Sequence, residues 1–178
     1  MDKFKARFVD KGFSQKEGIE FSETFAPVVR YSFIGAVISI AAKLGWQIHQ
    51  RNVKTMFLNG VVEETMYIEQ PEGFEVHNRA SHVCRLRRAL YGLKQEPHAW
   101  YTRIDSYLLG MGFTKSEADS NLYYILVKGE TLILVLHVDD LFMTGLEKII
   151  YDCKRELAIE FEMKYLGLMH YFLGLEVW

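Results

Sequence analysis

The stretch that decides the fold is residues 131–144, TLILVLHVDDLFMT. Residues 131–138 have the apolar, β-branched character of a buried strand, and residues 141–144 resume it after two adjacent carboxylates, Asp139 and Asp140. The pattern therefore predicts two strands joined at an Asp-Asp pair. Tight hairpin turns favour Asn-Gly or Asp-Gly because they need positive φ, so Asp-Asp is a poor turn.

The Asp pair has two interpretations. Adjacent carboxylates at the rim of an apolar sheet repel each other, and a divalent cation offsets both the repulsion and the cost of desolvation. Alternatively, the pair is a solvated turn in which an Asp side chain caps its own backbone. A cation site that handles phosphates usually takes a further carboxylate from another strand. The other strand pattern that ends in a tight segment, residues 46–53, offers only an amide there, Asn52.

Outward from this hairpin, the sequence predicts strands and helices that interleave without strict βαβ alternation. We expect helices over 32–44, from about Pro97 to Gly110, and over 147–161, and strands over 46–53, 82–86, 89–91, 122–127, 131–138 and 171–178. Lys128-Gly129-Glu130 is a plausible hairpin turn, and Gly45 is placed to end the first helix. The predicted class is α+β, with helices packed on one face of an antiparallel sheet.

Composition narrows the class of protein further. The chain has 178 residues, 49% hydrophobic and 25% charged, and its formal charge is −2. These values predict one globular domain and exclude disorder, and the charge counts mildly against a nucleic-acid binder. No apolar run reaches the roughly 18 residues of a membrane span, and no signal peptide is visible, so we expect a cytoplasmic, non-secreted protein. Cys84 and Cys153 are expected to be isolated buried thiols.

Several motifs in order carry a family resemblance. The chain resembles the reverse transcriptase of copia-type LTR retrotransposons over essentially its whole length. The matching residues are Lys5-Ala6-Arg7, Lys11-Gly12-Phe13, Phe21-Ser22-Glu23-Thr24-Phe25-Ala26-Pro27-Val28, Val53-Lys54-Thr55, Phe57-Leu58-Asn59-Gly60, Tyr91-Gly92-Leu93-Lys94-Gln95 and Val138-Asp139-Asp140. The resemblance implies a fingers and palm fragment of a right-hand polymerase over residues 1–178, truncated, with the thumb and RNase H absent. Leu173-Gly174 would then belong to the primer grip.

The resemblance also implies RNA-directed DNA polymerase chemistry with two Mg²⁺ ions, acting on an RNA or DNA template-primer and dNTPs inside a virus-like particle. Asp139 and Asp140 would be catalytic metal ligands, with Asp139 the better placed. The nucleotide-binding residues it implies are Phe57, Gln95, Lys5 and Arg7. Separately, Arg85, Arg87, Arg88 and Lys94 cluster with only one acid nearby, Glu96, and this local basic patch is expected to bind the phosphates of nucleic acid. Read without the resemblance, these residues are equally a core Phe, a surface Gln and exposed basic side chains.

The chain departs from the family pattern at and beside the site. Asn52 stands at the position of the first catalytic Asp, Met56 replaces a small Ala, and His137 replaces a Tyr. Glu96 and His98 replace an Ala and an Arg. We therefore expect a copy whose fold survives better than its catalysis. A nucleic-acid-binding remnant and a non-functional structural fragment remain the alternatives, and the oligomeric state is open.

Overall fold

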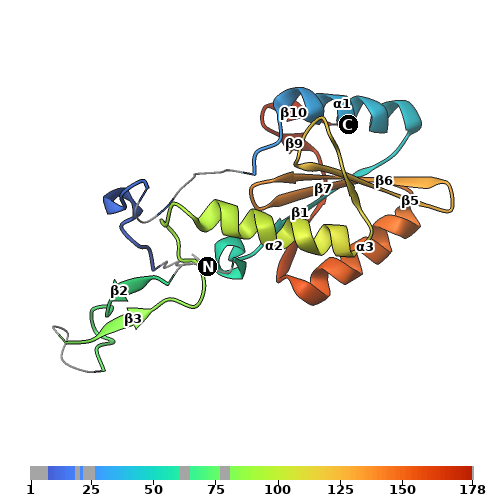
Figure 1. Ribbon diagram of the computed structural model, residues 1–178. Coiled ribbons are helices and arrows are strands. Elements are labelled where there is room, and N and C mark those ends of the chain that lie inside the picture. Colours follow the sequence, from blue (N-terminus) through green and yellow to red (C-terminus); the bar gives the residue numbers. More distant parts are fainter. Residues whose placement is uncertain (1–7, 19–20, 22–26, 61–64, 77–80, 178) are drawn as a thin grey trace, which may run out of the picture. The chain divides into compact units, whose positions relative to one another are not determined.

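The computed structural model describes residues 8–18, 21, 27–60, 65–76 and 81–177. The chain divides into two compact units. The arm unit comprises residues up to 26 and residues 57–104, and the sheet unit comprises residues 27–56 and 105–178. Each unit is described by itself, and Figure 1 gives the element labels.

The sheet unit is built on one six-stranded antiparallel sheet (Figure 1). Its strand order is β4-β5-β6-β7-β1-β8. The strands are β1 (Ile48–Val53), β4 (Thr114–Lys115), β5 (Leu122–Val127), β6 (Glu130–His137), β7 (Asp140–Gly145) and β8 (Met163–Leu168). Every pairing in it is antiparallel, which confirms the predicted antiparallel sheet.

The turn between β6 and β7 lies one residue earlier than the sequence suggests. His137 pairs with Asp140, so the two turn residues are Val138 and Asp139, and Asp140 is the first residue of β7. The Asp pair therefore does not form the turn by itself. The β5–β6 turn is Lys128-Gly129, as predicted, with Glu130 opening β6.

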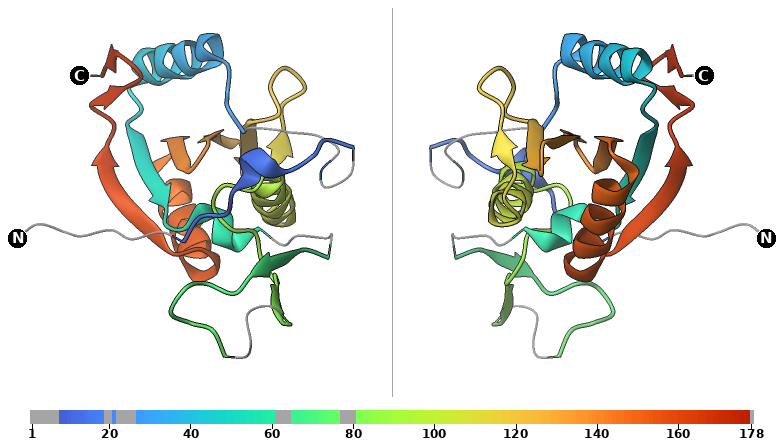
Figure 2. Two further views of the ribbon diagram at one scale, coloured as in Figure 1. Left: turned by 90° about the vertical axis from the view of Figure 1, so that its left-hand side faces the viewer. Right: turned by 90° about the vertical axis from the view of Figure 1, so that its right-hand side faces the viewer.

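The helices α1 (Tyr31–Leu44) and α3 (Glu147–Glu160) cover opposite faces of the sheet (Figures 1 and 2). Successive residues of a strand point to opposite faces, and in β1 Ile48 packs in the α1 core while His49 contacts α3. The expectation of helices on one face was therefore wrong. The sequence of β1, IHQRNV, is polar on both sides and gives no alternation that would have shown this.

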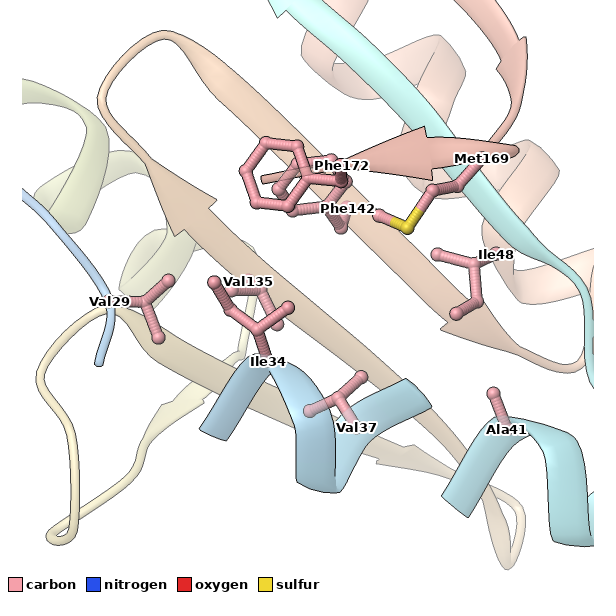
Figure 3. Packing of buried hydrophobic residues seen from close by; sticks show 9 residues of the cluster. All are labelled: Val29, Ile34, Val37, Ala41, Ile48, Val135, Phe142, Met169 and Phe172. Carbon is pink, nitrogen blue, oxygen red and sulfur yellow. The ribbon is translucent and has the colours of Figure 1, made fainter. Parts of the chain in front are cut away.

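The core beneath α1 is aliphatic and aromatic (Figure 3). Its buried members are Val29, Ile34, Val37, Ala41, Ile48, Val135, Phe142, Met169 and Phe172. Helix α1 begins at Tyr31, and its N-cap residue Arg30 makes no side-chain capping hydrogen bond. It ends at Gly45, whose φ of 68° is left-handed and whose N–H contacts the carbonyls of Ala41 and Ala42, as predicted.

The C-terminal segment of the sheet unit is a small hairpin rather than one strand over 171–178. Strands β9 (Tyr171–Phe172) and β10 (Leu175–Glu176) pair across Leu173 and Gly174, which both have positive φ. Cys153 on α3 is buried, and burial raises the pKa of its thiol to about 12, whereas Cys84 is only half-buried. Among the described residues, no helix has the length and apolar character needed to cross a membrane.

The arm unit contains less regular structure. The 3₁₀ turn η1 (Gly12–Ser14) and the two-stranded ribbon of β2 (Tyr67–Glu69) and β3 (Val83–Arg85) belong to it. Residues 89–91 form no strand, and only Tyr91 bridges, to Val9. The turn η2 (Met56–Asn59) and helix α2 (Glu96–Gly110) each have residues in both units.

Candidate active site

The sheet brings three polar side chains together where β1 meets the β6–β7 turn. Asn52 pairs in register with Asp140. The Asn52 Nδ2 donates to Asp139 Oδ2 at 2.8 Å and to Asp140 Oδ1 at 3.3 Å. The Val53 N–H donates to the Asp139 carbonyl at 2.8 Å, which fixes the turn against the end of β1. The predicted grouping of Asn52 with the two carboxylates is thus present.

The backbone of this turn is strained. Val138 has a φ of 58°, although a β-branched residue at positive φ is an outlier. Where only the first of two turn positions has positive φ, as here, the favoured residue is Gly. The Val138 N–H donates to the Pro27 carbonyl at 2.8 Å, so the surrounding chain holds the turn in place. Strain of this kind clusters at functional sites.

Burial sets the electrostatics of the site. It raises the pKa of Asp140 above its usual range, and the charge of Asp139 adds to the rise. Hydrogen bonds from Asn52 and Gln50 and the nearby His137 act in the opposite direction. Burial also lowers the pKa of His137, against the attraction of both carboxylates. The site therefore gathers negative charge in a place where water stabilises it poorly.

The donor set suits a hard cation only in part. Two carboxylates and an amide are present, and the described ranges contain no cluster of three or more His, Cys, Asp or Glu side chains able to hold a metal ion. Asn52 points its Nδ2 at the acids, whereas a cation binds the amide oxygen. Rotating the amide by a half turn would exchange the two atoms. Asp139, Asp140 and Asn52 Oδ1 could then share one cation, with one negative charge fewer than three carboxylates provide.

The predicted nucleotide-binding residues belong to the arm unit. Gln95 is only 7% exposed, so it is not a surface residue, and its Oε1 accepts from Gln15 Nε2 at 3.1 Å. Gln15 Oε1 in turn accepts from the Lys94 N–H at 2.8 Å. Lys5 and Arg7 lie outside the described residues. Phe57 lies on η2, and its side chain is outside the description.

Glu96, the first residue of α2, turns inward from this loop. It is 4% exposed, and its Oε2 accepts from the Gly92 N–H at 2.8 Å while its Oε1 is buried without a partner. Burial raises the pKa of Glu96 to about 7, and the Gly92 hydrogen bond only partly opposes this. The acid that departs from the family's Ala is therefore a buried group. Met56 is likewise buried.

The four predicted nucleic-acid-binding residues are all exposed on the arm unit: Arg85, Arg87, Arg88 and Lys94. Arg85 and Arg87 line a hollow of about 480 Å³ together with Leu86. The Arg88 Nη1 donates to the Leu58 carbonyl at 3.3 Å, which holds its guanidinium near η2. A local basic surface therefore exists on a chain whose net charge is −2.

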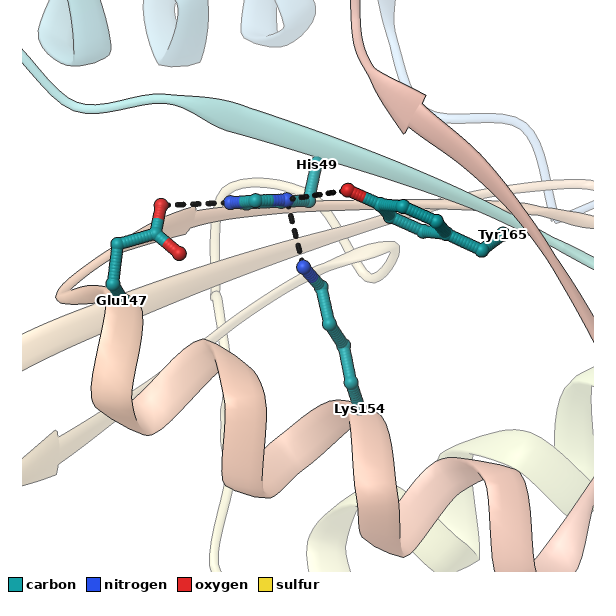
Figure 4. A network of polar contacts seen from close by, with 4 residues as sticks. All are labelled: His49, Glu147, Lys154 and Tyr165. Atoms are coloured by element: carbon teal, nitrogen blue, oxygen red, sulfur yellow. Dashed lines mark hydrogen bonds and ion pairs between the residues drawn. The ribbon is translucent and has the colours of Figure 1, made fainter.

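Sequence reasoning missed Gln50 and a polar network on the opposite face of β1. Gln50 hydrogen-bonds Asp140, and its position two residues before Asn52 on one strand was the available signal. On the α3 side, His49 is 6% exposed, and its Nε2 lies 2.7 Å from Glu147 Oε1 (Figure 4). The His49 Nδ1 lies 2.7 Å from Lys154 Nζ and 3.4 Å from the Tyr165 hydroxyl.

This network has a clear structural role. An ammonium group can only donate hydrogen bonds, so His49 Nδ1 must accept from Lys154. The His49 Nε2 must therefore be protonated and donate a hydrogen bond to Glu147. The buried imidazole thereby joins β1 to two separate turns of α3 (Figure 4). Burial lowers the pKa of Lys154 despite the nearby Glu147. We assign the network to anchoring the strand that carries Asn52.

Comparison with known proteins identifies the class of protein. The chain matches the family described as "Reverse transcriptase (RNA-dependent DNA polymerase)" over residues 1–178. The chain therefore belongs to the reverse transcriptase family, and no solved structure matches it.

The curated relatives narrow this to transposon Pol polyproteins. The chain is 42% identical over 177 residues to the retrovirus-related Pol polyprotein from transposon TNT 1-94 of Nicotiana tabacum, covering 98% of this chain and 13% of the relative. It is 39% identical over 178 residues to the retrovirus-related Pol polyprotein from transposon RE1 of Arabidopsis thaliana. This match covers 99% of this chain and 12% of the relative. A putative transposon Ty5-1 protein of Saccharomyces cerevisiae is 35% identical over 127 residues, covering 71% of this chain and 41% of the relative. The copia-type resemblance is confirmed.

Proposed function

We propose that this chain is the RNA-directed DNA polymerase region of a copia-type Pol polyprotein, comprising fingers and palm segments, and that this copy is catalytically impaired. The observation that carries the proposal is the meeting of Asn52, Asp139 and Asp140 at a strained hairpin turn. The chain spans only 12% to 13% of its full-length plant relatives, so the substrates, a template-primer and dNTPs, belong to the proposal as well.

The proposed chemistry needs positive charge held close to the reacting phosphates. Asp139 and Asp140 would hold Mg²⁺, which when bound neutralises the triphosphate and activates the primer hydroxyl. Gln95 would contact the nucleotide from its fixed place beside Gln15, and the exposed arginines of the arm unit would hold backbone phosphates. Phe57, Lys5 and Arg7 would complete the nucleotide pocket. By family, the domain would work in a cytoplasmic virus-like particle.

Asn52 supports the proposed impairment. Its amide supplies two hydrogen bonds where a carboxylate would supply a full negative charge. The two acids are thereby satisfied without a cation, and a second cation lacks a bridging ligand. The expected result is weak cation binding and little or no nucleotide transfer.

The test compares the unmodified chain with Asn52→Asp. Primer extension on an RNA template is measured with Mg²⁺ or Mn²⁺, and Mn²⁺ binding is followed separately by electron paramagnetic resonance. We expect negligible extension by the unmodified chain and tighter Mn²⁺ binding by Asn52→Asp, with the double variant Asn52→Asp, Asp139→Asn as the negative control. Robust extension by the unmodified chain would disprove the impairment, and equal Mn²⁺ binding by all variants would disprove the cation site.

A second candidate function is nucleic-acid binding without catalysis. The hollow lined by Arg85 and Arg87 favours it, because guanidinium groups pair with phosphates irrespective of the state of the acidic site. It predicts binding of RNA or DNA that weakens steeply with salt and no nucleotide incorporation. A chain that binds neither polymer at low salt would instead be a structural remnant.

A further inference from the structure

The ribbon of β2 and β3 presents an aromatic ring beside a guanidinium. Tyr67 pairs with Arg85 across the ribbon, and Glu69 pairs with Val83. These four residues are exposed and lie on one face, while Ile68 and Cys84 on the other face are half-buried. Directly opposed residues in an antiparallel pair have their Cβ atoms about 5 Å apart, so Tyr67 and Arg85 start from adjacent positions on the exposed face of the ribbon.

The same ribbon adjoins the basic hollow. The hollow of about 480 Å³ is lined by Arg85, the residue paired with Tyr67, and by Leu86 and Arg87. Tyr67 is 61% exposed, so most of its ring surface is open to a ligand. An exposed ring on β2, a guanidinium on β3 and a second guanidinium two residues beyond the end of β3 thus belong to one short stretch of the arm unit.

This combination fits a single strand of nucleic acid better than a duplex. Exposed bases stack on aromatic rings, a contact of about 1 to 3 kcal/mol per base, while arginines track the phosphates. In a duplex the bases are already stacked on one another, so an aromatic ring on a ribbon surface gains nothing. Charge complementarity also limits the extent of the site, because Glu69, Glu72 and Glu75 follow Tyr67 along the chain and would repel phosphates there.

We propose that Tyr67, Arg85 and Arg87 form a binding site for one or two nucleotides of single-stranded nucleic acid, with a base stacked on Tyr67 and phosphates held by the arginines. This inference rests on the proposed function, because the proposed function is what identifies the bound polymer as nucleic acid. It is independent of Asn52, Asp139 and Asp140, and so of catalysis. Tyr67 is the new element, because the arginines alone would bind single and double strands alike.

The test measures binding of a labelled single-stranded RNA 12-mer by fluorescence anisotropy at stepped salt concentrations. We expect Tyr67→Ala to weaken binding by roughly 5- to 150-fold, as loss of one stacked base requires. Tyr67→Phe keeps the ring and should bind within about twofold of the unmodified chain. Arg87→Ala should make the negative slope of log affinity against log salt shallower by about 1, because one phosphate contact is lost. Tyr67→Ala should leave this slope unchanged.

Matched controls separate the site from general effects. Tyr151 on α3 of the sheet unit is 68% exposed, so Tyr151→Ala removes a comparably exposed ring and should not change binding. A duplex of the same length should bind Tyr67→Ala and the unmodified chain equally. Salt-dependent binding that Tyr67→Ala leaves within about twofold would overturn this inference alone. If the unmodified chain binds neither RNA nor DNA at low salt, both this inference and the nucleic-acid-binding part of the proposed function are overturned. The primer-extension assay tests catalysis separately.

Discussion

Two hairpin turns of the same sheet differ in what determines them. The β5–β6 turn has Lys128 and Gly129 at φ of 54° and 86°, the positive values that favoured two-residue turns require, and a Gly to accept one of them. The β6–β7 turn has Val138 at φ of 58°, followed by Asp139. The β5–β6 turn contains Gly129, which adopts positive φ without penalty, whereas the β6–β7 turn contains Val138, a β-branched residue that rarely adopts it.

The difference shows that the β6–β7 turn is held by its surroundings. The Val138 N–H bonds the Pro27 carbonyl, the Asp139 carbonyl accepts from Val53, and the Asp139 side chain accepts from Asn52. These contacts come from segments distant in the sequence, whereas Lys128 and Gly129 follow local turn chemistry. Strain maintained by distant contacts is typical of a turn that places functional groups.

The largest expected effect comes from converting the amide of Asn52 into a third carboxylate. Without divalent cations, Asn52→Asp should lower the free energy of unfolding by about 3 kcal/mol, because two hydrogen bonds to charged groups become repulsions. Millimolar Mg²⁺ or Mn²⁺ should restore most of this loss. Urea unfolding with and without the cation measures both quantities.

The ordinary turn supplies the control for that experiment. Lys128→Asp also adds an acid to a hairpin turn of the same sheet, but without the Asp139 and Asp140 pair beside it, so its stability should not respond to the cation. A stability of Asn52→Asp that is unchanged by divalent cations would show that the three side chains do not form a cation site.

The next effect tests the ordinary turn itself. Gly129→Val should cost about 2 kcal/mol, because a β-branched residue must then adopt positive φ with no contacts to hold it there. A Cβ at this position meets no atom within 4 Å, so the cost is conformational rather than steric. Urea unfolding measures it, and a loss below about 0.5 kcal/mol would mean that the turn relaxes to another type.

The reverse substitution in the strained turn should be stabilising. Val138→Gly removes the penalty of positive φ, worth roughly 1 to 2 kcal/mol, and loses part of the gain to the entropy of Gly. We expect a net rise in the free energy of unfolding on the order of 0.5 to 1 kcal/mol. Thermal unfolding measures the change, and a destabilised Val138→Gly would show that the Val138 side chain contributes packing that outweighs the strain.

The sequence predicted those features that local chemistry determines. The Lys128-Gly129 turn, the Gly45 end of α1 and the antiparallel hairpin around the two carboxylates follow from neighbouring residues. The placement of β1 between β7 and β8 and the face that each helix covers depend on long-range packing. Asn52 was found on the strand pattern over residues 46–53, and the family motif then assigned it the position of the first catalytic Asp. The strain at Val138 was not predicted, because no local signal indicates it.

The smallest effect concerns the pKa of Asp140, which the strained turn places in a partly buried position. Because burial raises this pKa in the folded chain, Asp140 adds stability that is fully present below its ordinary pKa near 3.8 and is lost as the pH rises through the raised value. The unfolding free energy of the unmodified chain should therefore fall over that window relative to Asp140→Asn, which cannot titrate there.

Asn52→Ala removes a hydrogen bond that lowers the pKa of Asp140, so the Asp140 carboxyl should titrate at a still higher pH in this variant. The titration is followed by ¹³C NMR of the carboxyl carbon. A titration unchanged by Asn52→Ala would mean that the amide does not control the charge of the pair, and the contrast between the two turns would then rest on backbone strain alone.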